Sequence, residues 1–199
     1  MKSCYSFFQM ILIFSFFAGC ERNTNPFIPD DYKNAFYPLH IGNQWTYNQQ
    51  YPSVETVTSS AIFAGKTYFN IEGSQLLQPE FWIREHENVI YFFDKEKNSE
   101  YKLFDFRADP GTEWDLPGGY GCNFGERIEV VSRAETLDTP LGSFSDCYHF
   151  HHIGGCADGG VEDTWFVRGV GLVKSVHEFW SGYREFYLVG YTLQPAHTN

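Results

Sequence analysis

The feature that most constrains the fold of this chain is a long succession of short strand-like segments separated by turn residues. The segments are rich in Val, Ile, Thr, Tyr, Phe and Trp, which favour strands, and Gly, Asn, Asp or Pro lie between them. Apolar residues do not recur with the period of a helix over any long stretch, and only residues 29–39 could hold a short helical turn. The pattern therefore predicts an all-β protein.

The connections between these segments indicate how the strands are arranged. The predicted strands are residues 43–51, 53–60, 66–73, 80–86, 89–95, 100–106, 127–137, 143–153, 161–169, 171–180 and 183–193. Most gaps between them are as short as a hairpin turn, which implies that neighbouring strands run antiparallel. A longer loop over residues 109–126 holds one short strand at its middle. We predict an antiparallel meander that forms a curved sheet, a half-barrel or a barrel, with a β-sandwich as the main alternative.

The last predicted strand carries large side chains at successive positions. Alternation places Tyr183, Tyr187 and Tyr191 on one face, and Phe186 and Leu188 on the other. Because both faces carry large apolar groups, we expect this strand to be covered on two sides or to line a closed sheet.

The amino-terminal segment has the order of an export signal. Lys2 precedes an apolar run over residues 5–17, which is shorter than the ~20 residues that a membrane-spanning helix needs. Two small residues follow, as cleavage sites require, and Cys20 comes directly after them. The stretch "FAGC" resembles the lipobox of bacterial lipoproteins, in which the cysteine receives a diacylglycerol and the chain is cut before it. The resemblance implies a signal peptide over residues 1–19 and a lipid on Cys20; a plain secretory signal is the alternative.

The chain after the signal divides into two parts. Residues 20–36 are largely polar and hold two prolines, which is typical of a tether, and residues 37–199 are predicted to form a single β domain. The membrane is then a partner through the lipid on Cys20, and we expect the bacterial cell envelope, on its periplasmic or cell-surface side. The net charge of −11 argues against nucleic acid as a partner, because phosphate binding needs clustered Lys and Arg.

Three stretches of the predicted domain resemble motifs of a known group of proteins. They are "YPLHIGNQWTY" at residues 37–47, "TPLGSFSDCY" at residues 139–148 and "WFVRGVGLVKS" at residues 165–175. In this order they are similar to stretches of a widespread class of uncharacterised bacterial lipoproteins and secreted domains. The resemblance implies an antiparallel β domain over residues 37–193. It implies no established reaction, so it identifies no catalytic residue.

The same motifs also carry turn and core signals. Gly42 predicts a turn before Trp45, which we expect to lie in the core. Gly142 shapes a hairpin, and Gly169 and Gly171 mark a bulge or a bend where the strand direction changes.

The cysteines predict one disulfide bond in the folded part. If Cys20 is acylated, Cys122, Cys147 and Cys156 remain, and an exported compartment permits disulfides. Cys122 and Cys156 lie in glycine-rich loops, whereas Cys147 lies in a strand-like run. We favour a Cys122–Cys156 disulfide, and other pairings stay open.

The stretch "CYHFHH" offers the strongest candidates for chemistry. In a strand, Cys147, His149 and His151 point to one face, and thiolate and imidazole are ligands that zinc prefers. A further ligand, such as His177 or Asp146, would have to come from elsewhere. We favour the alternative that the histidines are half-buried or solvated strand residues. No metal site and no cofactor is therefore predicted, and His149 and His151 remain the candidates to test.

Other chemical signals are sparse. Asp158, Glu162 and Asp163 could hold calcium, but their spacing is not that of a calcium loop, and an acidic turn is the preferred interpretation. The chain has no G-x-S-x-G stretch that would point to a nucleophile, and an enzyme is not expected. Eight aromatic residues are expected in the core, although some could line an apolar cleft: Phe81, Trp82, Tyr91, Phe92, Phe93, Tyr101, Phe104 and Phe106.

Three hypotheses about function follow from these patterns. The first is a lipid-anchored β domain that binds or scaffolds an envelope protein without catalysis. The second is a carrier of an apolar ligand in the concavity of the sheet, which an open cavity lined by aromatic residues would favour. The third is a metal-dependent enzyme that uses His149 and His151, which requires both imidazoles within ~2.0–2.3 Å of the metal.

Overall fold

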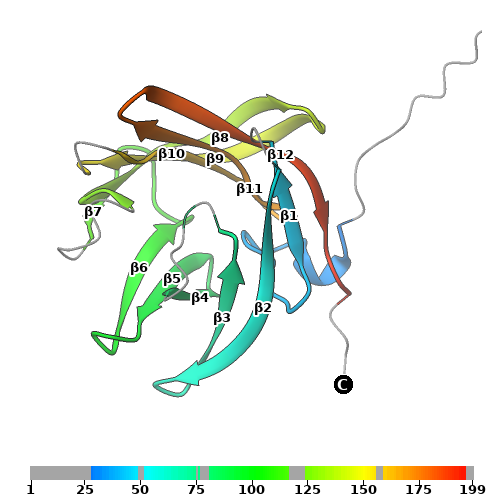
Figure 1. Cartoon of the computed structure of the whole chain (residues 1–199), viewed down its shortest axis with the longest axis vertical. Helices are drawn as coiled ribbons and strands as arrows, with labels where there is room; N and C mark the ends of the chain where they lie inside the picture. The colour runs from blue at the N-terminus through cyan, green and yellow to red at the C-terminus, as the bar shows by residue number, and fades with distance from the viewer. Residues whose placement is uncertain are drawn as a thin grey trace, which may run out of the picture.

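The computed structural model describes residues 28–48, 52–74, 76, 81–116, 124–155 and 159–195. They form a short 3₁₀ turn, η1 (Asp30–Tyr32), and twelve strands (Figure 1). The strands are β1 (Gln44–Tyr47), β2 (Ser53–Phe63), β3 (Lys66–Glu72), β4 (Phe81–His86), β5 (Val89–Asp94), β6 (Ser99–Asp105), β7 (Glu113–Asp115), β8 (Arg127–Thr139), β9 (Gly142–Ile153), β10 (Gly159–Val167), β11 (Gly171–Phe179) and β12 (Gly182–Thr192). Among these residues there is no helix with the length and apolar character that a membrane crossing requires.

The twelve strands form one antiparallel sheet, which confirms the predicted meander. The order across the sheet is β6-β5-β4-β3-β2-β1-β12-β11-β10-β9-β8-β7. Consecutive strands are neighbours from β1 to β6 and from β7 to β12, and the first strand pairs with the last. β6 and β7 follow each other in the chain but lie at the two ends of the sheet. Hydrogen bonds between the described strands therefore leave the sheet open rather than closing it into a barrel.

The sheet is curved, so that its two halves face each other across one core (Figure 1). The ring centroid of Phe104 in β6 lies 5.0 Å from that of Phe150 in β9 and 4.8 Å from that of Phe166 in β10. A β-sandwich would need two separate sheets, whereas the pairing of β1 with β12 joins both halves into one. Of the predicted alternatives, the structure has the curved antiparallel sheet.

The first strand enters the core as its motif predicts. Gly42 forms the preceding turn with a φ angle of +93°. Trp45 is fully buried, and its indole N–H donates a hydrogen bond of 2.6 Å to the carbonyl of Val170. Gly171 lies against this indole with a φ angle of +109°, and an added Cβ would come within 3.0 Å of Trp45 Nε1. Both the backbone conformation and the available space therefore require glycine at this position.

The hairpin turns have the backbone geometry that short connections need. Glu87 and Asn88, between β4 and β5, have φ angles of +50° and +60°, as type I′ turns require. Ala64 and Gly65, between β2 and β3, have φ angles of +48° and +75°. The hairpin predicted at Gly142 joins β8 to β9, and the glycine there has a φ angle of +119°. These turns confirm the antiparallel connections that the sequence indicates.

The prediction that β12 is covered on two sides is wrong. Phe186 and Leu188 are buried, but Tyr183 on the opposite face is 67% exposed. The pairing of β12 with β1 is irregular by one residue, and this bulge interrupts the alternation of faces. Tyr191 consequently pairs with the buried Trp45 and packs against the core, where burial raises its pKa to about 12. One face of β12 is buried, and the other is partly open to solvent.

The segment before β1 lies across one end of the sheet, and we call residues 32–39 the N-terminal strap. Tyr32 and Phe36 are buried, and the ring of Phe36 stacks on that of Phe106 with a centroid distance of 3.8 Å. The composition predicts a tether over residues 20–36, but these contacts place the end of that range on the β domain. The folded body therefore begins before Tyr37.

Several predictions fall outside the described residues. They concern the signal peptide over residues 1–19, the lipid on Cys20 and the Cys122–Cys156 disulfide. Cys147 is described, and it is a buried free cysteine.

Candidate functional site

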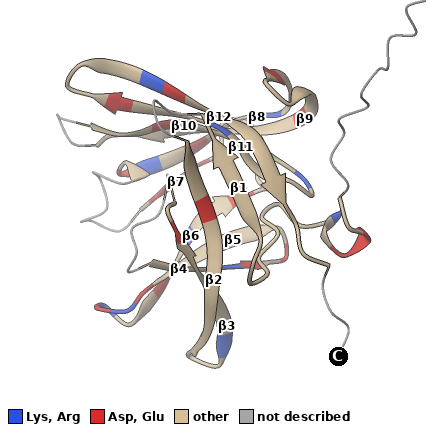
Figure 2. Ribbon diagram, turned by 45° about the vertical axis from the view of Figure 1, so that its right-hand side comes forward, with Lys and Arg blue, Asp and Glu red and all other residues tan. Residues whose placement is uncertain are grey.

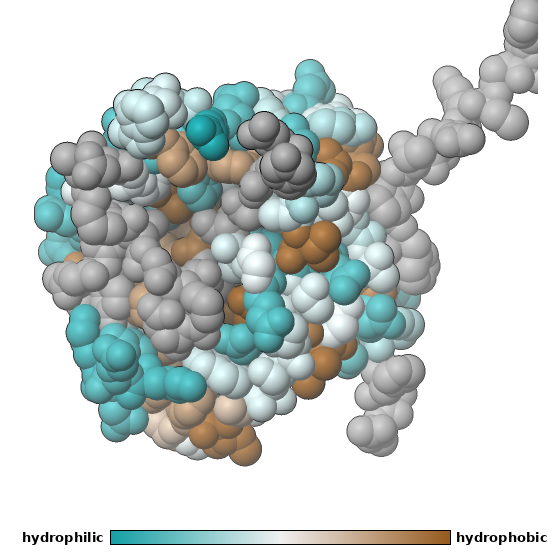
Figure 3. All heavy atoms as spheres, viewed as in Figure 1, coloured by the Kyte–Doolittle hydropathy of each residue, from teal (hydrophilic) through white to brown (hydrophobic). Residues whose placement is uncertain are grey.

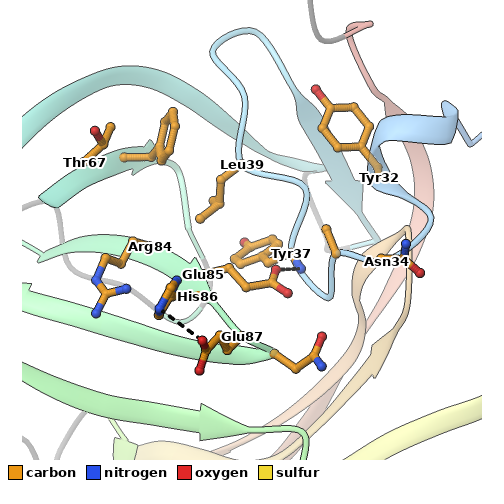
Figure 4. Close-up of a pocket in the computed structure, with 12 residues that line it drawn as sticks. Tyr32, Asn34, Tyr37, Leu39, Thr67, Arg84, Glu85, His86 and Glu87 are labelled. Carbon is orange, nitrogen blue, oxygen red and sulfur yellow. Dashed lines mark hydrogen bonds and ion pairs between the residues drawn. The ribbon is translucent and has the colours of Figure 1, made fainter.

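A hollow of about 560 Å³ opens at one end of the sheet, between the N-terminal strap and strands β3 and β4 (Figure 4). The strap, both strands and the turn after β4 contribute its wall, namely Tyr32, Asn34, Ala35, Tyr37, Leu39, Thr67, Phe69, Arg84, Glu85, His86, Glu87 and Asn88. Small-molecule sites typically have volumes of roughly 300–1,000 Å³, so the hollow is large enough to hold a ligand.

Glu85 lies in the wall of the hollow and fastens the strap to β4 (Figure 4). Its carboxylate oxygens accept hydrogen bonds from the backbone N–H groups of Phe36, at 2.9 Å, and Tyr37, at 2.8 Å. Burial raises the pKa of Glu85, although these hydrogen bonds and the charge of Arg168 act in the opposite direction. The carboxylate is thus occupied by the chain itself and serves to hold the strap.

The other half of the sheet holds the same strap through the turn between β10 and β11. Arg168 Nη1 donates a hydrogen bond of 2.8 Å to the carbonyl of Asn34, and the guanidinium lies 4.0 Å from the ring centroid of Phe36. The backbone N–H of Gly169 donates a hydrogen bond of 2.6 Å to the carbonyl of Ala35. The strap is therefore fixed to both halves of the curved sheet, and the predicted bend at Gly169 is one of its anchor points.

Tyr37, in the wall of the hollow, forms a buried polar pair with Glu55 in the core. Its hydroxyl donates a hydrogen bond of 2.8 Å to Oε2 of Glu55 in β2, a residue with 0% of its surface exposed. Burial, and then the charge of Glu55, raise the pKa of Tyr37 well above its ordinary value, so the phenol keeps its proton and remains a donor. The sequence alone does not reveal this pair. Glu55 faces the core because it lies opposite the buried Trp45 in the β1–β2 pair, and that register is known only from the structure.

The positive charge of Arg84, in the wall of the hollow, is balanced by a carboxylate. Arg84 forms a bidentate ion pair with Glu100 of β6, with nitrogen–oxygen distances of 2.6 and 2.9 Å. Leu39 and Phe69 add apolar surface to the wall. The hollow therefore suits an uncharged, partly apolar ligand better than an ion.

The eight aromatic residues that could have lined a cleft do not line this hollow. Four of them belong to the main hydrophobic core cluster: Phe81, Phe92, Phe104 and Phe106. Trp82 and Phe93 pack around Phe63 instead, with centroid distances of 5.3 and 4.8 Å. The hollow takes its aromatic rings from the strap and from Phe69, which the sequence analysis did not single out.

The histidines of β9 belong to a separate polar group, which we call the histidine cluster (Glu135, His149, His151 and Asp163). His149 lies between two carboxylates, with Nδ1 at 2.9 Å from Glu135 Oε1 and Nε2 at 2.7 Å from Asp163 Oδ1. His151 Nδ1 lies 3.1 Å from the same oxygen of Asp163. The cluster therefore ties β8, β9 and β10 together.

Trp165 of β10 extends the histidine cluster. Its indole N–H donates a hydrogen bond of 2.7 Å to Glu135 Oε2, and its ring stacks on His149 with a centroid distance of 4.2 Å. Lys174 of β11 places its ammonium 4.7 Å from the centroid of the indole ring. These contacts carry the network onto a fourth strand.

The charges within the histidine cluster support one another. Burial acts to lower the pKa of His149, but the hydrogen bonds to Asp163 and Glu135 outweigh it and hold this pKa above its ordinary value. Burial acts to raise the pKa of Asp163, but the hydrogen bond and charge of His149, with those of His151, hold it below its ordinary value. A protonated imidazole has an N–H on both nitrogens, so His149 can donate to both carboxylates at once.

This arrangement does not suit a metal ion. Zinc binds the lone pair of an imidazole nitrogen at ~2.0–2.1 Å, whereas both nitrogens of His149 face carboxylates as donors. Neither predicted further ligand joins the pair, since His177 hydrogen-bonds to Ser175 Oγ at 3.0 Å and Asp146 is exposed. Among the residues that the structure describes, no group of three or more His, Cys, Asp or Glu side chains is placed to hold a metal ion.

The neighbouring candidates also have structural partners. Burial, and then the charge of Glu135, raise the pKa of Cys147 to about 11, so this cysteine is a thiol at neutral pH. His152, on the opposite face of β9, donates a hydrogen bond of 2.9 Å from Nδ1 to the carbonyl of Phe124. Burial lowers the pKa of His152 to about 4, so its imidazole is neutral. Neither side chain has the properties of an activated nucleophile or base.

Of the three acidic residues considered as calcium ligands, Glu162 is half-buried in β10, where burial, and then the charge of Glu178, raise its pKa. Asp158 lies outside the described residues, and Asp163 is bound to the two histidines. The signal that could have identified this pairing is register, because Asp163 lies directly opposite His151 in the β9–β10 pair. Sequence reasoning placed both residues on strands but did not align the strands.

Comparisons with known proteins give the following result. No protein-family model and no curated protein sequence matches this chain. Among solved structures, a protein of Bacteroides fragilis described as exported, with a YmcC-like fold, has a TM-score of 0.44 and 15% identity, over 79% of this chain and 98% of the other. A protein of Parabacteroides distasonis described as a lipoprotein has a TM-score of 0.41 and 14% identity, over 79% of this chain and 98% of the other. The function must therefore be argued from the residues of this chain.

Proposed function

We propose that this protein is a membrane-anchored bacterial lipoprotein of the cell envelope whose β domain binds or scaffolds another molecule without catalysing a reaction. The observation that carries the proposal is the apolar run over residues 5–17, which ends in small residues and Cys20 and is followed by a polar chain. Two or three acyl chains on Cys20 would hold the protein at a membrane, since each buried CH₂ contributes about 0.8 kcal/mol and one chain alone binds reversibly.

The attachment of the strap to both halves of the sheet supports a role in binding or scaffolding. The chain that leads from the proposed anchor enters the body at the N-terminal strap, where Glu85 and Arg168 grip it from the two halves of the sheet. The polar groups with catalytic potential, His149 and Asp163, are bound to each other and hold strands together. We therefore favour binding or scaffolding over catalysis.

Acyl labelling in the native bacterium tests the anchor. Cys20→Ala is expected to abolish incorporation of a labelled fatty acid and to release the protein from the membrane fraction. Cys4→Ala, which alters the cysteine inside the signal peptide, serves as the matched control and should be labelled as the wild type is. A Cys20→Ala protein that keeps its label and its membrane partitioning would overturn the proposal.

A second candidate function, a carrier of an uncharged apolar ligand, is favoured by the hollow beneath the strap. Native mass spectrometry of the full-length protein extracted from its own membrane should then show an added mass that is not the lipid on Cys20. Leu39→Trp would fill the hollow and remove this mass, whereas Ile62→Trp, on an exposed hairpin elsewhere, should retain it. An added mass that survives Leu39→Trp would place the ligand outside the hollow.

A further inference from the structure

The hairpin between β11 and β12 carries an aromatic tip that the fold itself does not use. Trp180, in the turn, is 88% exposed, and Tyr183, at the start of β12, is 67% exposed. No hydrogen bond or ring contact joins Trp180 to another residue in the described part of the chain. The other four tryptophans, which are all described, are buried or half-buried, so Trp180 is distinct in its exposure.

The turn geometry does not explain a tryptophan at this place. The conformational demand falls on Gly182, which has a φ angle of +107°. Comparable tight turns in this protein use small or polar residues, Ala64 with Gly65 and Glu87 with Asn88. An exposed indole at such a tip keeps a large apolar ring in water, so covering this ring would be favourable.

The chemistry of the tip fits a membrane surface. Trp and Tyr combine an apolar ring with a hydrogen-bonding group, and they concentrate where lipid meets water. Charges near the tip are balanced. Glu178 precedes it and Arg184 follows it, with the guanidinium 4.8 Å from the centroid of the Phe179 ring. Glu185 is paired with Lys174 at 2.9 Å. The tip can therefore approach zwitterionic headgroups without burying an excess of either charge.

The rest of the surface does not offer an electrostatic alternative. The net charge is −11, and in Figure 2 the acidic and basic residues are scattered along the strands rather than gathered into one basic face. Figure 3 shows that apolar residues on its face form small separate patches, one of them over the β2–β3 hairpin, where Ile62 is 73% exposed. Ile62 is aliphatic and has no polar group for the interface, so it provides a natural comparison for Trp180.

We propose that the β11–β12 tip (residues 179–183) inserts Trp180 and Tyr183 into the headgroup region of the membrane to which Cys20 is anchored; this inference rests on the proposed function. Seven residues separate Cys20 from Ile28, and the eight Cα–Cα steps between the two span at most about 26–29 Å. A domain of this size has a radius of gyration of about 15 Å, so the tether is long enough for the body to lie on its side. The lipid and the aromatic tip then form two attachment points that fix the orientation of the hollow.

Lipid-dependent quenching of tryptophan fluorescence tests this orientation. The full-length acylated protein would be reconstituted into phosphatidylcholine vesicles with plain or brominated acyl chains, and the vesicles would be floated to confirm attachment. Brominated lipid is expected to quench the wild type, and Trp180→Phe should lose most of that quenching while floating equally well. Ile62→Asn, the matched control on the other hairpin, should be quenched as the wild type is.

The outcomes separate the two proposals. Vesicles that carry the protein but leave Trp180 unquenched overturn the membrane contact, while the anchor stands. Protein that fails to float overturns the anchor and this inference with it. Adding phosphatidylglycerol should not increase the quenching, and a marked increase would contradict insertion driven by aromatic rather than charged groups.

Discussion

Replacement of His149 by phenylalanine tests whether the histidine cluster holds the sheet together. The substitution keeps an aromatic ring to stack on Trp165 and removes both donors, at 2.9 Å from Glu135 and 2.7 Å from Asp163. Hydrogen bonds to charged groups contribute about 1.5–3 kcal/mol each, but both carboxylates retain other hydrogen-bond partners. Their side chains are also 35% and 25% exposed, so water can solvate them in the variant. We therefore expect the free energy of unfolding to fall by about 2–3 kcal/mol, which is at or below the lower end of the combined range for two such bonds.

The pH dependence of this loss follows from the direction of the two pKa shifts. The folded protein binds the proton of His149 more tightly than the unfolded chain, because its pKa is raised. Its contribution is thus complete below the unfolded value of ~6.5 and is lost as the pH rises through the folded pKa. The pKa of Asp163 is lowered, so its contribution is present above ~3.9 and is lost as the pH falls through the folded value. The difference between wild type and variant should be largest between these limits.

Urea unfolding followed by circular dichroism at pH 5, 6, 7 and 8.5 measures this difference. His86→Phe is the matched control, since its imidazole is 61% exposed, and a surface change of this kind is expected to alter the free energy of unfolding by less than about 0.5 kcal/mol. A His149→Phe variant as stable as the wild type at pH 6, or a difference that grows as the pH rises, would refute the reasoning.

Two further substitutions test the strap and the glycine beneath Trp45. Glu85→Ala leaves two backbone donors of the strap without their acceptor, and we expect it to lower the free energy of urea unfolding by about 2–4 kcal/mol. Glu85→Gln should lose less, because one side-chain oxygen remains as an acceptor. Equal losses in the two variants would contradict the role of Glu85 in holding the strap. Gly171→Ala combines backbone strain with a Cβ 3.0 Å from Trp45 Nε1, and it should lower the free energy of unfolding by about 2–4 kcal/mol. Gly65→Ala, whose added Cβ would have no atom within 4 Å, should lower it by about 1 kcal/mol. Similar losses at both glycines would show that the close approach to Trp45 is unimportant.

The strap gives the proposed anchor a mechanical connection to the whole fold. A pull on the tether reaches the body at the strap, where Glu85 of β4 and Arg168 after β10 hold it from opposite halves of the sheet. The same segment forms one wall of the hollow.

The histidine cluster shows how a motif can resemble a metal site and have another role. His149 and His151 share a face because they are two residues apart in a strand, as a pair of zinc ligands could be. The neighbouring strands place Glu135 and Asp163 at hydrogen-bond distance, so the imidazoles are held by carboxylates. The decisive residues lie 12 and 14 positions away in the chain, and only the alignment of strands brings them together.

The sequence by itself determined the strands, the turns and the antiparallel meander, because these depend on local backbone preferences and on the alternation of side chains. The conformations of Gly42 and Gly142 are properties of single residues, so these two turns could be predicted without knowledge of the neighbouring strands. The apolar segment that ends in Cys20 is local in the same sense.

The tertiary structure decided which strands align, which faces are buried and which polar groups meet. The bulge between β1 and β12 places Tyr191 against the core, and the strap packs on the folded body. Inside the core, Tyr37 forms a hydrogen bond to Glu55. Each of these outcomes depends on register between segments far apart in the chain. A shift of one residue reverses the face of every following side chain, and the energy that selects the register comes from packing across the whole sheet.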